Sequence, residues 1–93
     1  TEFHRIGVMA HAFHVDTIPH ASIGCGIFMA ASLQATAALQ KVPYHEYQHS
    51  VFDRNLQYVD TTMHCAAGAY HLPTGPGHGV TPRPELWQHV VRG

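Results

Sequence analysis

The chain has 93 residues, a formal net charge of −1 and 45% hydrophobic residues, which limits it to one small domain with a modest core. The charge is balanced and Lys and Arg do not cluster, so the composition argues against a nucleic-acid partner. Two cysteines do not make a disulfide framework, and the first residues lack a basic segment followed by an apolar run. We therefore expect no secretory signal and a reducing compartment, the cytoplasm.

The first half of the chain predicts an alternation of helices and strands. Helical spacing of apolar residues predicts helices over Glu2–Phe13, with Thr1 as N-cap, and over Ile27–Leu39. Short β-like runs predict strands at His14–Ile18, stopped by Pro19, and at Val42–Tyr47. This order favours a parallel sheet with crossover helices.

Residues 17–40 contain no Asp, Glu, Lys or Arg over a length that could cross a membrane. They are rich in Ala, Gly, Ser, Thr and Gln, so we predict a buried helix behind a short strand and no membrane contact.

The second half is less regular. Gln48–Asn55 reads as a polar stretch, and Gly68 as a turn between extended pieces near Thr61–Cys65 and Ala69–Leu72. A Pro/Gly loop follows, and Pro84–Val91 is predicted to be a short helix with Pro84 in its first turn. We predict an irregular tail after the helix-strand-helix-strand unit.

One stretch matches a zinc-protease motif. His45-Glu46-Tyr47-Gln48-His49 fits H-E-x-x-H, which binds zinc when it lies on a helix. On the predicted strand, His45 and His49 would lie about 13 Å apart and could not share an ion. His11 and His14, three residues apart, form another weak candidate pair, whereas the adjacent His64 and Cys65 point to opposite faces of an extended piece.

Two other residues are better candidates for catalysis. His20 follows the first predicted strand, and Glu46 lies near the end of the second. In a parallel β/α barrel, both strand ends lie on the face where catalytic groups collect. An imidazole exchanges protons near neutral pH, and a protonated carboxyl group can donate a hydrogen bond to a developing oxyanion. A rim histidine and a solvated glutamate are the alternative.

Four stretches carry a family resemblance: "TEFHRIGVMAHAFHV", "IPHASIGCGIFMAASLQATAAL", "VPYHEYQHSVFDRN" and "LPTGPGHGV". In this order they resemble the C-terminal part of an enolase-superfamily protein of the mandelate racemase/muconate lactonizing enzyme type. "EYQHSVFDRN" is most similar to members that dehydrate acid sugars.

The resemblance implies an α/β fold, the C-terminal piece of a (β/α)7β TIM-like barrel. Residues 1–59 would be its last helix/strand units, and residues 60–93 a tail returning toward the capping domain. His20 would match the family's acid/base histidine and Glu46 its electrophilic glutamate, with Ser22 and Tyr47 near an acid-sugar substrate. His78 departs from the family, where Leu is usual in that turn.

The resemblance also implies what these residues lack. The family's Mg²⁺ ligands and catalytic lysines would lie on earlier strands, so we expect no metal ligand or cofactor in this chain. The main hypothesis is therefore a C-terminal fragment of a sugar-acid dehydratase or racemase-type enzyme, inactive alone and associated with the missing barrel half or with copies of itself as a homo-oligomer. The alternatives are a non-catalytic oligomeric binding module of barrel origin and a small zinc hydrolase using residues 45–49.

Overall fold

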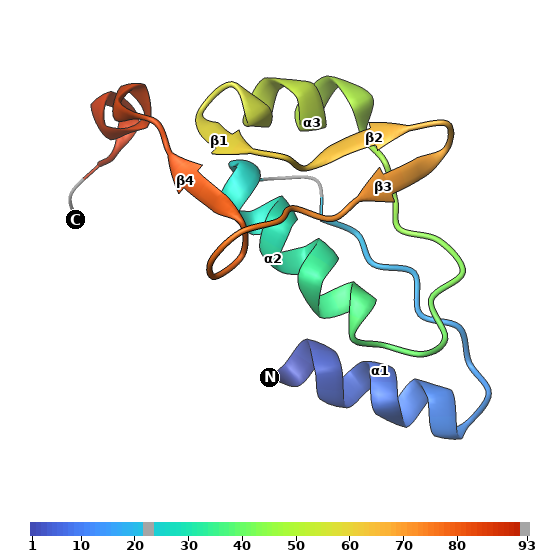
Figure 1. The fold of residues 1–93 in the computed structure, drawn as a ribbon. Helices are drawn as coiled ribbons and strands as arrows, with labels where there is room; N and C mark the ends of the chain where they lie inside the picture. Colours follow the sequence, from blue (N-terminus) through green and yellow to red (C-terminus); the bar gives the residue numbers. More distant parts are fainter. Residues whose placement is uncertain (22–23, 92–93) are drawn as a thin grey trace.

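A central helix, α2, organises the chain, with the other elements packed around it. The computed structural model describes residues 1–21 and 24–91 (Figure 1). Helix α1 lies against one end of α2, while α3 and the strands lie along its other side. The elements in chain order are α1 (Glu2–Ala12), α2 (Gly26–Ala37), α3 (His49–Leu56), β1 (Val59–Thr61), β2 (His64–Ala66), β3 (Ala69–His71), β4 (Val80–Pro82) and the 3-10 helix η1 (Pro84–His89).

The three helices predicted from the sequence are confirmed. Helix α1 begins after Thr1, which is its N-cap by position, and α2 starts and ends within two residues of the predicted bounds. The C-terminal helix is of the 3-10 type, with Pro84 at its start, and ends at His89. Within the described ranges, no helix has the length and apolarity needed to cross a bilayer.

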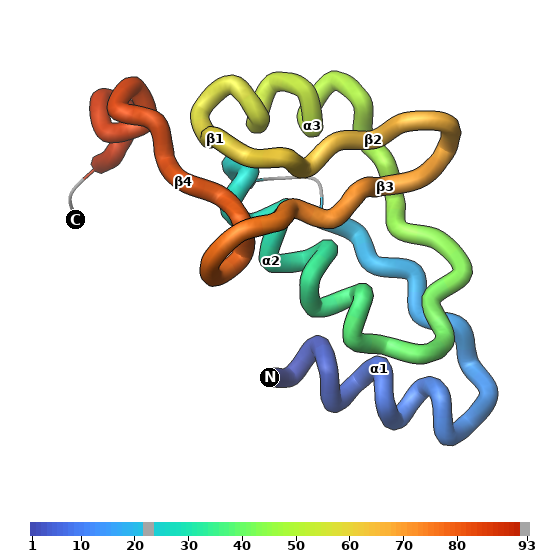
Figure 2. Tube along the Cα trace, in the orientation of Figure 1, coloured from blue at the N-terminus to red at the C-terminus, as the bar shows by residue number. Residues whose placement is uncertain are grey.

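The two predicted strands at His14–Ile18 and Val42–Tyr47 are wrong as strands. Both segments are extended and run side by side in the same direction (Figure 2). Their described backbone hydrogen bonds are Thr17 N–H to Lys41 O at 3.2 Å and Glu46 N–H to Pro19 O at 3.1 Å. Because a parallel ladder needs evenly spaced bonds and usually further neighbouring strands, two bonds do not make a sheet. Of the predicted parallel pairing, the structure contains only this contact between the two segments.

The sheets that do form among the described residues are antiparallel. Strands β2 and β3 make a hairpin in which His64 is opposite His71 and Cys65 opposite Tyr70. Its two-residue loop has positive φ at Ala67 (50°) and Gly68 (76°), as a tight hairpin turn requires. The turn at Gly68 was predicted. The pairing of β1 with β4, which joins segments some twenty residues apart, was not.

Helix α3 corrects the prediction of a polar stretch at Gln48–Asn55. Its exposed residues are polar, but Phe52 is 3% exposed and Leu56, one turn later, packs against the same core. The buried core consists of Ala21, Met29, Ala30, Leu33, Phe52 and Met63. It lies between α2, α3 and the hairpin, so it fixes the elements that carry the candidate site.

A large apolar surface lies outside this core. Ile6, Met9 and Phe13 of the α1 region are 62%, 65% and 76% exposed, and Ile18 is 58% exposed. The radius of gyration is 14.2 Å, whereas about 12 Å is typical of a compact domain of this length. The chain therefore exposes several large apolar side chains that its own core does not cover.

Candidate active site

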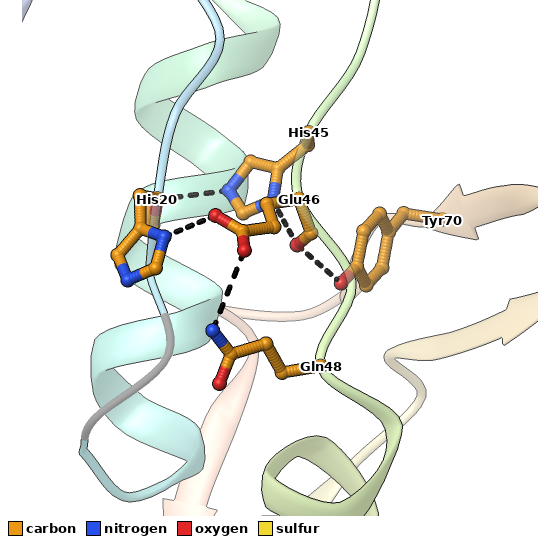
Figure 3. A network of polar contacts seen from close by, with 6 residues as sticks. His20, His45, Glu46, Gln48 and Tyr70 are labelled. Atoms are coloured by element: carbon orange, nitrogen blue, oxygen red, sulfur yellow. Dashed lines mark hydrogen bonds and ion pairs between the residues drawn. The ribbon is translucent and has the colours of Figure 1, made fainter.

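The two extended segments bring His20 and Glu46 into contact. His20 lies one residue after Pro19, whose carbonyl oxygen accepts the Glu46 N–H. This backbone bond sets the two side chains next to each other on the same side of the pair of segments (Figure 3). The side chains are 62% and 43% exposed, so both can be reached from solvent.

The Glu46 carboxylate is held at both oxygens. Oε2 accepts a hydrogen bond from Nδ1 of His20, and Oε1 accepts a bond of 3.4 Å from the Gln48 amide (Figure 3). The His20 bond, followed by the Gln48 bond, lowers the pKa of Glu46 below its ordinary value. The carboxyl group is therefore ionised at neutral pH in this chain.

The backbone of Glu46 is fixed from the opposite side. Its carbonyl oxygen accepts the Tyr70 hydroxyl at 3.0 Å and the Nδ1–H of His45 at 3.1 Å. The Tyr70 ring comes from β3 and packs edge-on against Phe52, which anchors it to the core. Burial is the main cause that raises the pKa of Tyr70 to about 12, so its hydroxyl keeps its proton and donates.

The zinc-hydrolase interpretation of residues 45–49 is wrong. Residues 44–48 are extended, and α3 begins only at His49, so the two histidines do not lie one helical turn apart. The imidazole of His45 bridges Ser32 Oγ, at 3.0 Å from Nε2, and the Glu46 carbonyl. Among the described residues, no group of three or more His, Cys, Asp or Glu side chains could hold a metal ion.

The two predicted substrate-binding residues have different outcomes. Ser22 lies outside the described residues. Tyr47 packs against Phe52 and Tyr70 and lines an open hollow of about 480 Å³. Neither His20 nor Glu46 lines this hollow.

Sequence reasoning missed Gln48 and Tyr70. Gln48 could have been found, because residues two apart on an extended segment point to the same side, and Gln48 follows Glu46 at that spacing. No local pattern identifies Tyr70, which reaches Glu46 from 24 residues away.

Comparison with known proteins assigns the chain to a family. The sequence family described as enolase C-terminal domain-like matches residues 1–86. The chain belongs to this family, and the predicted fold class, a C-terminal α/β piece of an enolase-superfamily barrel, is confirmed. No curated protein matches the chain.

Solved structures agree with this assignment. The chain is 53% identical to a "putative isomerase" from Sinorhizobium meliloti in an open loop conformation, with a TM-score of 0.87. It is 49% identical to an enolase-superfamily member from Agrobacterium tumefaciens, also with a TM-score of 0.87. Each match covers 92% of this chain, but only 23% and 22% of the two longer chains. Because the chain spans less than a quarter of these proteins, the matches do not show that it has the activity of a whole enzyme.

Proposed function

We propose that the chain supplies the acid–base and oxyanion groups of a sugar-acid dehydratase or racemase-type enzyme, which removes the proton α to a carboxylate. The observation that supports this most is the contact between His20 and Glu46 across two parallel extended segments. Membership of the enolase C-terminal domain-like family supports it independently. The division into barrel units (residues 1–59) and a tail (residues 60–93), and a substrate contact by Ser22 or Tyr47, belong to the same proposal.

In the proposed reaction, His20 moves one proton in each step. A carboxylate at Glu46 accepts the Nδ1–H of His20, which leaves the basic lone pair of the neutral imidazole on Nε2. Nε2 takes the α-proton of the sugar acid, and the resulting imidazolium returns it to the β-hydroxyl as that group leaves as water. In a racemase-type reaction, the imidazolium keeps this proton, and an acid on the opposite face of the α-carbon, which the rest of the assembly would supply, delivers another. When the substrate lies between the two side chains, Glu46 takes up a proton from solvent and donates a hydrogen bond to the substrate carboxylate, where negative charge develops.

The described residues do not fit a magnesium site. Mg²⁺ prefers carboxylate oxygens, and the carboxylate in the site, Glu46, already bonds His20 and Gln48. No larger cluster of ligands is present among the described residues. We therefore propose that the chain alone does not turn over.

Association is the second part of the proposal. Ile6 and Met9 are exposed on α1, Phe13 directly after it, and Ile18 in the first of the two extended segments. Another polypeptide that covered these side chains would bury apolar area. It would also place further strands beside the two extended segments, which form no sheet by themselves. A non-catalytic binding module would need the same covered surface but not the contact between His20 and Glu46.

The test is a chimera in which this chain replaces the matching quarter of the Sinorhizobium protein. Exchange of the α-proton in D₂O is followed by NMR over a panel of sugar acids with Mg²⁺ in the buffer. We expect exchange by the chimera and none by the chain alone, with a loss of at least about 100-fold on His20→Asn and on Glu46→Gln.

The matched control is His49→Gln, which alters the first residue of α3 and leaves the contact between His20 and Glu46 in place. Exchange that survives both His20→Asn and Glu46→Gln would refute the proposed roles. Exchange by the chain alone would refute its dependence on a larger assembly.

A further inference from the structure

A second pair of histidines lies on the β2–β3 hairpin, outside the contact between His20 and Glu46. His64 and His71 are directly opposite each other on β2 and β3. Their imidazole rings stack with centroids 4.2 Å apart and planes only 4° from parallel. Both residues are exposed, so solutes can reach the ring edges.

The hairpin fixes this arrangement. Successive strand residues point to opposite faces, so the inner pair Cys65 and Tyr70 packs against the core while His64 and His71 face outward. The tight loop at Ala67 and Gly68 sets the register that makes the histidines direct neighbours. The pair is therefore held on a regular element and does not depend on a loose loop.

A hydrogen bond sets the tautomer of the His64 ring and leaves its lone pair on Nε2. Nδ1 of His64 lies 2.9 Å from the carbonyl oxygen of Thr62. Because a carbonyl oxygen only accepts, Nδ1 must carry the proton, and the neutral ring then has its lone pair on Nε2. Histidines that bind metals usually donate their other ring N–H to a backbone carbonyl in this way.

We propose that His64 and His71 form a two-histidine site for a divalent transition-metal ion of the zinc, nickel or copper type. Imidazole nitrogen suits these ions, whereas magnesium and calcium prefer oxygen. Two Zn–N bonds at a tetrahedral angle place the nitrogens about 3.4 Å apart, so the rings must tilt from the stack to converge on one ion. Both rings lie on the solvent side of the hairpin, where this tilt meets no core packing, and water completes the coordination.

The test uses zinc binding by the whole chain at neutral pH, measured by titration calorimetry, with native mass spectrometry to count ions per chain. His64→Thr and His71→Thr remove one ligand each and keep a residue that favours strands. We expect one zinc ion per chain in the wild type and a loss of affinity of about tenfold or more in each variant. Melting temperatures without zinc establish that the variants fold.

Two matched controls separate this site from other histidines. His11→Gln removes the member of the His11 and His14 pair that lies on α1, and His49→Gln breaks the H-E-x-x-H string. Both should keep the affinity of the wild type. The proposal is overturned if the wild type binds no zinc, if either threonine variant binds it as tightly as the wild type, or if a control variant loses it.

Discussion

Removing one hydroxyl group tests how firmly the hairpin holds the candidate site. Tyr70→Phe deletes the O–H that donates to the Glu46 carbonyl at 3.0 Å and leaves the ring contacts with His45, Tyr47 and Phe52 in place. A hydrogen bond of this kind contributes about 1 kcal/mol net. For a domain of this size, that loss lowers the melting temperature by about 4–8 °C.

The same hydroxyl predicts a dependence on alkaline pH. The pKa of Tyr70 is raised from 10.0 in the unfolded chain to about 12 in the fold. A group whose pKa rises on folding contributes stability that is complete below the unfolded value and is lost as pH rises through the folded value. The wild type should therefore lose its advantage over Tyr70→Phe between about pH 10 and pH 12.

The assays are thermal unfolding followed by circular dichroism and titration of tyrosine absorbance in the near ultraviolet. Tyr44→Phe is the control, because that side chain is 73% exposed. The reasoning is refuted if Tyr70→Phe melts at the wild-type temperature at neutral pH, or if Tyr44→Phe loses as much stability. It is also refuted if the titration shows no tyrosine ionising later than the others.

Three further predictions concern charge and backbone shape. The bond to His20 lowers the pKa of Glu46, so the stability that this carboxylate contributes is present above the ordinary pKa of 4.5 and is lost in acid. The urea midpoints of Glu46→Gln and the wild type should therefore differ at neutral pH and converge as pH falls below 4.5. A difference that stays constant with pH would contradict this. Gly79 has φ +72°, and a Cβ there would lie 2.9 Å from backbone atoms, so Gly79→Ala should lower the free energy of unfolding by about 2–5 kcal/mol. Gly77→Ala should lower it by only about 1–2 kcal/mol, because φ is +63° there but no described atom lies within 4 Å. Equal losses of the two variants in urea unfolding would contradict the clash at Gly79. Ala67→Asn should stabilise the hairpin by about 0.5–1 kcal/mol, because Asn tolerates the positive φ of 50° better than Ala, and a lower urea midpoint would contradict it.

Local patterns in the sequence were enough for α1, α2, η1 and one turn, but not for α3. Apolar spacing identified α1 and α2, and Pro84 identified the start of η1. The polar character of Gln48–Asn55 hid α3, although Phe52 and Leu56 have the four-residue spacing of a buried helix face. The pairing of β1 with β4 could not be predicted, because three-residue strands carry no periodicity and their partners are distant in sequence.

The candidate site was predictable in part for a related reason. His20 and Glu46 were identified because two parallel segments put their ends on one side, and that holds even though the segments form no ladder. The wrong step was to infer strands from composition alone, since a strand exists only with neighbours that complete its hydrogen bonds. Gln48 follows from the two-residue spacing of an extended segment, whereas Tyr70 depends on a tertiary contact that no spacing rule describes.

The charge of Glu46 decides whether its proposed role is possible. In this chain the carboxyl group is ionised, whereas donating a hydrogen bond to an oxyanion requires a proton. The largest cause that lowers the pKa of Glu46 is the direct bond to His20, and burial already acts in the opposite direction. A substrate lying between the two side chains would remove the first cause, and a covering polypeptide would strengthen the second. We therefore expect the pKa of Glu46, measured by carbon NMR of its carboxyl group, to lie below 4.5 in the chain alone and above 4.5 in the chimera with a bound sugar acid. A carboxyl group that stays ionised in both would rule out Glu46 as the oxyanion donor and leave it only the task of orienting His20.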